Sequence, residues 1–267
     1  MIARLALTLT LLISGSMLCQ AAEYKLAIQP ILPEKELIEI YQPLADYLSK
    51  ATGQTISIST ERNFTFYWHK MYQKRGGYDL VLDAAHFTDY RIQQQGYQAI
   101  VKMPDTVSFS IVTHEDNFVL DIKELTNKRI ATMPSPSLGA MRLEKLFPNP
   151  VRIPLYTYER NANKAVESVL SGKVDAAIIP TPLASQYTNL NTVMTTEPVP
   201  HMALSASPEV PADIVEKIRT ALIEAPTTAD GKTLLARLKL EKFEATDNAT
   251  YAGYAKLLEG IYGYDQH

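Results

Sequence analysis

A chain of 267 residues, 46% hydrophobic and 21% charged, is too long for one small module and too apolar for a disordered or fibrous protein. Its 26 basic and 29 acidic residues give a formal net charge of −3, which argues against a broad basic surface for nucleic acid or anionic lipid. The single cysteine, Cys19, excludes an internal disulfide, and its expected loss with a leader segment leaves no thiol for a zinc ribbon or a nucleophile. One or two compact domains are expected.

Residues 1–22 have the pattern of a cleavable secretory signal. Arg4 is their only charge, an apolar run covers residues 5–13, and small residues close the segment at Ala21-Ala22. The run is too short for a membrane anchor, which needs about 20 apolar residues. Cleavage predicts a soluble periplasmic chain of net charge −4, expected as a monomer. Leu18-Cys19 leaves a lipoprotein open as the alternative.

An approximate internal duplication organises the remaining chain. Residues 76–85 and 171–180 each contain Gly-x-x-Asp followed by an apolar strand, and each follows a helix-period apolar pattern. With the segments upstream, each half reads β-α-β-α-β, the pattern of a parallel sheet covered by helices. The expected strands are residues 24–29, 56–60, 80–85, 129–133, 151–156 and 176–180.

Two further segments are expected to join the halves. Residues 106–113 and 194–204 are β-branched and extended in character, which is typical of strands that cross between domains. After them, a helix at 213–224 and further helices to 258 are expected to return to the first half. The prediction is an α/β fold of two βαβ domains, residues 23–108 with 201–267 and residues 109–200, joined by a two-strand hinge with a ligand cleft between them.

Ligands of open α/β sheets collect beyond the carboxyl ends of the strands, where helix N-termini present N–H groups. The segment at 134–140 is the sharpest candidate, because it supplies two hydroxyls, free backbone N–H groups and a glycine. Its predicted anion-binding residues are Ser135, Ser137, Leu138 and Gly139. The alternative is an ordinary helix N-cap, in which a serine satisfies the first turn.

The other predicted ligand-binding residues lie at equivalent strand and helix ends. Asn63, Phe64 and Thr65 open a helix in the first half, and Asn161 opens its counterpart in the second. Each asparagine either donates to ligand oxygens or caps its helix. His86 follows a strand, where it either neutralises an anion or simply begins a helix. Tyr158 and Thr181 complete the predicted cleft residues.

Patterns for catalysis are missing from the sequence. It contains no Gly-x-Ser-x-Gly, His-Glu-x-x-His, Walker or Gly-x-Gly-x-x-Gly motif, and its five histidines show no metal-ligand spacing. No catalytic residue, metal or cofactor is therefore predicted, and a binding protein is preferred to an enzyme. An enzyme would need His86 beside a carboxylate such as Asp83 or Asp89.

Five motifs together resemble a known family. They are residues 41–48 with Thr52-Gly53, Gly77-x-Asp79, residues 121–130, Ser135-x-Ser137-x-Gly139, and residues 165–177. In this order they resemble the phosphate, phosphite and phosphonate type of solute-binding proteins of bacterial ABC transporters. The resemblance implies a type 2 periplasmic-binding fold, capture of a small anionic solute by domain closure, and delivery to a membrane permease. A periplasmic accessory or sensor subunit, acting on a membrane receptor or redox enzyme, is the alternative.

The sequence departs from the family pattern at two places. Pro136 and Leu138 are inserted around the serines of the Ser135-x-Ser137-x-Gly139 motif, and Asn161-Ala162-Asn163 stands where phosphonate binders often have Ser-His-Asp. Anion binding through helix N-termini remains the expectation, since it depends on backbone geometry more than on side-chain identity.

Overall fold

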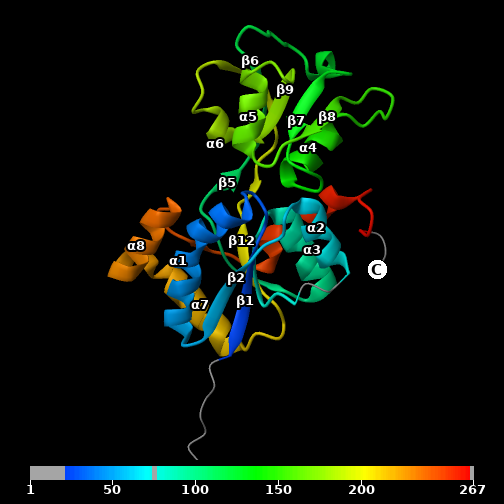
Figure 1. Ribbon diagram of the computed structural model, residues 1–267. Coiled ribbons are helices and arrows are strands. Elements are labelled where there is room, and N and C mark those ends of the chain that lie inside the picture. The colour runs from blue at the N-terminus through cyan, green and yellow to red at the C-terminus, as the bar shows by residue number, and fades with distance from the viewer. Residues whose placement is uncertain (1–21, 74–76, 265–267) are drawn as a thin grey trace, which may run out of the picture.

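The computed structural model describes residues 22–73 and 77–264, which form two lobes, one above the other in Figure 1. The first lobe is built on a six-stranded sheet in the order β13-β4-β12-β3-β1-β2. Its strands are β1 (Glu23–Ile28), β2 (Thr55–Ser59), β3 (Leu80–Asp83), β4 (Gln98–Lys102), β12 (Ala203–Ala206) and β13 (Glu244–Ala245).

The second lobe repeats this plan in a five-stranded sheet with the order β10-β6-β9-β7-β8. In each sheet the strand next to one edge pairs in parallel with both of its neighbours, β1 with β2 and β3, and β7 with β8 and β9. The strands of this sheet are β6 (Phe109–His114), β7 (Arg129–Thr132), β8 (Leu155–Tyr158), β9 (Ala176–Pro180) and β10 (Leu190–Thr195). The predicted duplication is therefore visible in the strand order.

Helices cover both faces of each sheet. The α-helices are α1 (Glu34–Thr52), α2 (Phe64–Tyr72), α3 (Ala85–Gln95), α4 (Leu138–Leu146), α5 (Ala162–Leu170), α6 (Thr181–Ala184), α7 (Ala212–Ile223) and α8 (Ala229–Leu238). Short 3-10 helices are η1 (Ile122–Leu125), η2 (Ala225–Thr227), η3 (Asn248–Tyr251) and η4 (Tyr254–Leu258).

The alternation of side chains along the strands explains the layers. In β1, Leu26 and Ile28 face the core beneath α1, α7 and α8, whereas Ala27 faces the aromatic core beneath α2, α3 and η4. In β9, Ile178 and Ile179 likewise point into opposite cores of the second lobe. Because both faces of each sheet are buried there, residues 26–28 of β1 and 176–179 of β9 are continuous apolar runs rather than alternating with polar residues.

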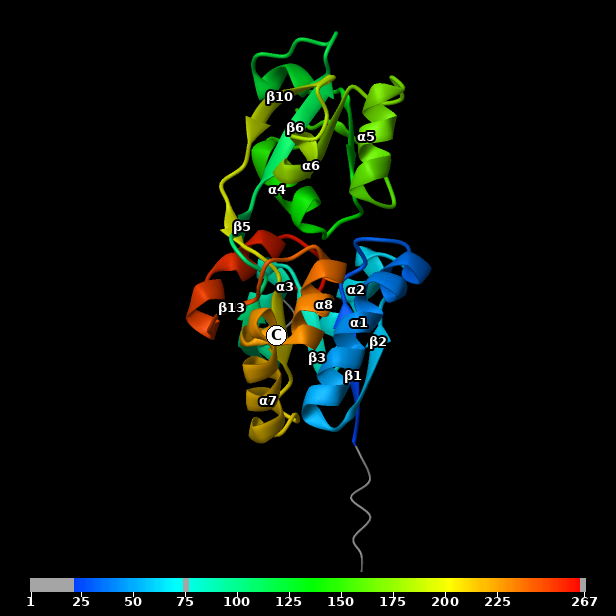
Figure 2. The same cartoon turned by 90° about the vertical axis from the view of Figure 1, so that its left-hand side faces the viewer.

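The chain crosses between the lobes twice, through a pair of short strands. β5 (Thr106–Val107) pairs antiparallel with β11 (Val199–Pro200), and Figure 2 shows the crossing along one side of the molecule. Beyond them, β6 joins the second sheet antiparallel to β9, and β12 joins the first sheet antiparallel to β3. The predicted two-strand connection is confirmed, and the residue boundaries 23–108 with 201–267 and 109–200 remain a prediction.

Two parts of the fold differ from the expected elements. The sequence predicts this strand at 151–156, whereas β8 begins at Leu155, because residues 150–152 form a turn and Pro154 has no N–H to donate to a neighbouring strand. Thr157 and Tyr158, expected in a loop, therefore belong to the strand. No element is predicted between residues 86 and 105, where α3 and β4 lie; a single residue, Ala84, separates β3 from α3.

The lobes also touch away from the hinge, through the start of α4. Thr65 Oγ1 donates to the carbonyl oxygen of Ser135 at 3.1 Å, and His86 Nε2 donates to that of Pro136 at 2.9 Å. Ala140 and Met141 of α4 pack into the aromatic core of the first lobe. This contact holds the 134–141 segment against α2 and α3 and fixes where α4 begins.

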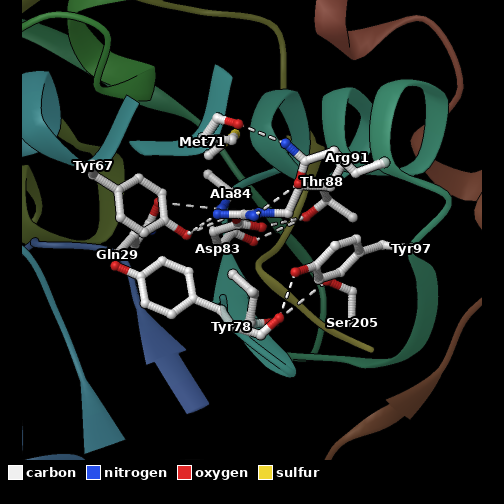
Figure 3. A network of polar contacts seen from close by, with 12 residues as sticks. Gln29, Tyr67, Met71, Tyr78, Asp83, Ala84, Thr88, Arg91, Tyr97 and Ser205 are labelled. Carbon is white, nitrogen blue, oxygen red and sulfur yellow. Dashed lines mark hydrogen bonds and ion pairs between the residues drawn. The ribbon is translucent and has the colours of Figure 1, made fainter. Parts of the chain in front are cut away.

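A buried ion pair supports the first-lobe side of this contact (Figure 3). Asp83, at the end of β3, accepts from Arg91 Nε at 3.1 Å, Tyr67 Oη at 2.8 Å and Thr88 Oγ1 at 2.9 Å. Burial raises the pKa of Asp83, and Arg91 with the two hydroxyls acts in the opposite direction. Burial alone would lower the pKa of Arg91, but Tyr67 and Asp83 hold it above its usual value. The charged pair thus links the end of β3 to α3, the helix that carries His86.

Removal of the Arg91 charge should strongly destabilise the protein. Arg91→Met leaves the Asp83 carboxylate buried without its cation, so the free energy of unfolding should fall by about 3–5 kcal/mol in urea titrations. Lys217→Met, which breaks the exposed pair with Asp213, is the matched control and should cost less than about 1 kcal/mol. Asp83→Asn in the Arg91→Met background should recover part of the loss. Equal effects of Arg91→Met and Lys217→Met would contradict the assignment.

Acid should destabilise the protein through His86, because protonation would place a charge on a fully buried ring. Burial lowers the pKa of His86 to about 4, below its ordinary value near 6.5. Between these two values the unfolded chain binds a proton that the folded chain does not, so stability should fall as the pH falls through this window. The loss from His86 should reach on the order of 3 kcal/mol near pH 4.

The measurement is the urea midpoint at pH 7, 5.5 and 4 for the natural chain and for His86→Gln, which keeps an amide donor and cannot become charged. His86→Gln should flatten the pH dependence. A slope identical in the natural chain and in His86→Gln would refute the role of His86.

Candidate functional site

A cavity of about 450 Å³ lies between the lobes, within the usual size range of small-molecule sites. It collects residues from the carboxyl ends of β1 and β3 in the first lobe and of β7 and β9 in the second. The hinge contributes Val107 and Phe109, and α4 and α5 contribute their first residues. Five of the predicted residues line it: Phe64, Ser137, Leu138, Gly139 and Asn161.

The start of α4 forms one wall of the cavity. Ser137 caps the helix: its Oγ accepts from the N–H of Ala140 at 3.3 Å and donates to the carbonyl oxygen of Met133 at 3.2 Å. The cap leaves the N–H groups of Leu138 and Gly139 without an intrahelical acceptor, at the positive end of the helix dipole. Ser137 is thus a helix cap that also lines the cavity, so its two predicted roles are compatible.

Gly139 is needed here for close packing of the protein itself. A Cβ at this position would lie 3.2 Å from the ring of Phe109, tighter than ordinary van der Waals contact. The glycine therefore lets α4 approach the hinge strand β6. Gly139, a predicted anion-binding residue, does line the cavity, but the space that a side chain would need there is occupied by Phe109.

The start of α5 lies on the same cavity. Asn161 Oδ1 accepts from the N–H of Lys164 at 2.9 Å, which caps the helix and leaves the first two N–H groups, of Ala162 and Asn163, without an intrahelical acceptor. Within the described chain no residue accepts a hydrogen bond from Asn161 Nδ2. Asn163 also lines the cavity and is exposed. Two helix N-termini of the second lobe thus converge on one space.

Thr132, the last residue of β7, is a site residue that the sequence did not reveal. It is 1% exposed and lines the cavity, and its Oγ1 is buried without a hydrogen-bond partner among the described residues. Buried hydroxyls are normally hydrogen-bonded, and an unpaired one costs about 1–3 kcal/mol. The only available signal was its place at the end of a strand.

The first-lobe side of the cavity presents polar groups that already have partners. Gln29 Oε1 accepts from the N–H of Ala84 at 3.1 Å, and its Nε2 contacts Met202 Sδ. His201 Nδ1 accepts from the N–H of Met202 at 2.7 Å, and burial lowers the pKa of His201. None of the described lining residues is Lys, Arg, Asp or Glu.

The remaining predicted residues do not line this cavity. Asn63 caps α2 by accepting from the N–H of Phe66 at 3.1 Å. Thr65, His86 and Ser135 form the contact between the lobes described above. Tyr158 is 55% exposed at the end of the edge strand β8. Thr181 Oγ1 lies 2.8 Å from Ser108 Oγ and 3.0 Å from Ser110 Oγ, at the hinge.

In residues 22–73 and 77–264, no group of three or more His, Cys, Asp or Glu side chains lies close enough to hold a metal ion. Over the same residues, no helix combines the length and apolar character needed to cross a bilayer.

The histidine and the two carboxylates that an enzyme would need have other partners. His86 bonds to Pro136, Asp83 bonds to Arg91, and Asp89 bonds to Gln93 and to the N–H of Ala255. The predicted signal peptide lies, apart from Ala22, outside the described residues.

Comparison with solved structures shows the type 2 periplasmic-binding fold. PhnD1 from Prochlorococcus marinus, in complex with methylphosphonate, is 14% identical with a TM-score of 0.74 over 88% of this chain and 97% of its own. A binding protein component of an ABC phosphonate transporter from Pseudomonas aeruginosa is 13% identical with a TM-score of 0.72 over 89% and 85%. XAC2383 from Xanthomonas citri, bound to ATP, is 13% identical with a TM-score of 0.70 over 90% and 100%.

Comparison with sequences places the chain more narrowly. No curated protein sequence matches it. The family model described as "ABC transporter, phosphonate, periplasmic substrate-binding protein" matches residues 26–251, which include both lobes and every residue of the cavity. The predicted resemblance is therefore confirmed. The chain belongs to the family of periplasmic substrate-binding proteins of ABC phosphonate transporters.

Proposed function

We propose that the protein captures a small oxyanion or phosphorus-containing compound of the phosphate, phosphite or phosphonate kind in the periplasm and delivers it to an ABC-transporter permease. The observation that carries this proposal is the convergence of the α4 and α5 N-termini on one cavity. Unpaired N–H groups at a helix N-terminus favour an anion, and two of them from one lobe define a head-group site.

Hinge closure completes the proposal. Ile31 and Leu32 of the first lobe and Asn161 and Asn163 of the second line the same cavity from opposite sides. The start of α4 already touches the first lobe, so closure would bring α5 toward the loop after β1. The β5 and β11 pair, as the two-strand link, would act as the hinge.

The alternative, an accessory or sensor subunit, would be favoured by an exposed apolar patch on the C-terminal tail. That tail packs on the first lobe instead: Tyr251 and Leu258 are fully buried, and Trp68 Nε1 donates to the carbonyl oxygen of Tyr262 at 2.7 Å. Tyr262 itself is 74% exposed, but a single exposed side chain is ordinary on a protein surface. Import of a solute is therefore the function that we propose.

The unpaired hydroxyl of Thr132 offers a sharp test of the head-group site. We expect the hydroxyl to bond the ligand, so Thr132→Val should weaken binding of methylphosphonate by about tenfold or more in calorimetric titration. The ligand-free variant should be as stable as the natural chain or up to about 2 kcal/mol more stable, because the unpaired polar atom is gone.

Thr113→Val is the matched control. Thr113 is also fully buried in the second lobe, but its Oγ1 donates to the carbonyl oxygen of Asn117 at 2.8 Å. That variant should lose about 1 kcal/mol of stability and keep its affinity. A Thr132→Val protein that is destabilised like Thr113→Val and binds normally would remove Thr132 from the site.

Ligand should also compact the protein. Small-angle X-ray scattering with and without saturating ligand should show a smaller radius of gyration in the bound state, because closure moves the lobes together. Scattering profiles that are identical in the two states would argue against capture by hinge closure.

A further inference from the structure

The wall of the cavity is predominantly apolar, and binding of an oxyanion at the helix ends does not account for this apolar lining. Ten large hydrophobic side chains line it, and they come from both lobes and from the hinge: Ile31, Leu32, Phe64, Val107, Phe109, Met133, Leu138, Ile178, Leu183 and Met202. An inorganic oxyanion of a few atoms would leave most of this wall without a partner.

The polar groups that are free to bind a ligand lie at one end. Thr132, Asn161, Asn163 and the first N–H groups of α4 and α5 all belong to the second lobe. On the first-lobe side, Gln29 bonds to Ala84 and Met202, and His201 Nδ1 accepts from the N–H of Met202, which leaves His201 Nε2 as the one ring donor without a partner among the described residues. Most of the free polar groups therefore lie at the helix starts of the second lobe, and Ile31, Leu32 and Phe64 form an apolar wall on the opposite, first-lobe side.

The described residues of the cavity wall include no lysine, arginine, aspartate or glutamate, which also favours an uncharged ligand body. No lysine or arginine is among the described residues that line the cavity, so a compact dianion would lose its hydration without gaining a cation. No aspartate or glutamate lines it either, so an ammonium group on the ligand would also be buried without a counter-charge. An apolar substituent meets neither penalty and gains from burial.

We propose that the ligand is an amphiphilic organic oxyanion, with its head group at the α4 and α5 N-termini and an uncharged apolar body against the first-lobe wall. This inference rests on the proposed function, since it refines which oxyanion the same cavity takes. Phosphate and amino-substituted phosphonates are then the weaker ligands, and alkyl- or arylphosphonates the stronger ones.

The experiment is a calorimetric series of ligands with one head group and growing bodies. Phosphate, methylphosphonate, propylphosphonate, butylphosphonate and phenylphosphonate are titrated into the full mature chain. Each added methylene should tighten binding by about fourfold until the wall is filled, and phenylphosphonate should bind more tightly than methylphosphonate. 2-Aminoethylphosphonate has as many non-hydrogen atoms as propylphosphonate and should bind at least about tenfold more weakly, because its ammonium has no partner.

A pair of variants ties the gain to the wall. Ile31 is partly buried and lines the cavity, so Ile31→Asn should flatten the chain-length series, with butylphosphonate losing more affinity than methylphosphonate. Ile223, at the end of α7 outside the cavity, is 38% exposed, and Ile223→Asn is the matched control that should keep the full series. Leu32→Asn is a second wall variant should Ile31→Asn fail to fold.

The possible failures can be told apart. Phosphate binding as tightly as butylphosphonate, or 2-aminoethylphosphonate binding more tightly than propylphosphonate, would overturn the amphiphilic ligand and leave the proposed function standing. A chain-length series that is unchanged in both Ile31→Asn and Leu32→Asn would also overturn the amphiphilic ligand and leave the proposed function standing. Absence of binding to every member of the series would overturn the proposed function and this inference with it.

Discussion

The double crossing of the chain between the lobes is the constraint on which the cavity depends. β6 enters the second sheet antiparallel to β9, and β12 returns to the first sheet antiparallel to β3, so the parallel strands of both lobes end toward the same space. Gln29 and Ala84 follow β1 and β3, while Thr132 and Pro180 end β7 and β9, and all four line the cavity. Two sheets with other connections would not bring these ends together.

Helix α4 contributes both to the cavity and to the contact between the lobes. The first N–H groups of α4 lie at the cavity, while Ala140 and Met141, within the same first turn, pack against the aromatic core of the first lobe. His86 and Thr65 hold the residues just before it. A ligand at the α4 start would therefore act on a segment that already touches both lobes, which gives binding a direct effect on how the lobes sit together.

The sequence predicted the architecture well because its signals are local or periodic. The Gly-x-x-Asp repeats and apolar runs identify the strands on each side, and Ser137 and Asn161 are recognisable helix starts.

The residues of the cavity wall were harder to predict from the sequence, since the direction of the Phe109 and Met202 side chains depends on strand register at the hinge. The partner of His86 is the carbonyl of Pro136, 50 residues away, and no local pattern encodes such a contact. Thr132 resembles any buried strand residue until its unpaired hydroxyl is seen.

The acidic composition is compatible with an oxyanion ligand when the sources of binding energy are compared. An exposed helix dipole contributes about 0.3–1 kcal/mol. Two helix ends therefore do more to orient a head group than to offset the free-energy cost of removing its water. Burial of apolar surface contributes about 25 cal/mol per Å², so a body of some 100 Å² would add about 2.5 kcal/mol. In a cavity whose described wall holds no lysine or arginine, the apolar body adds to the affinity that the helix ends and Thr132 provide, and the helix ends decide which way round the molecule sits.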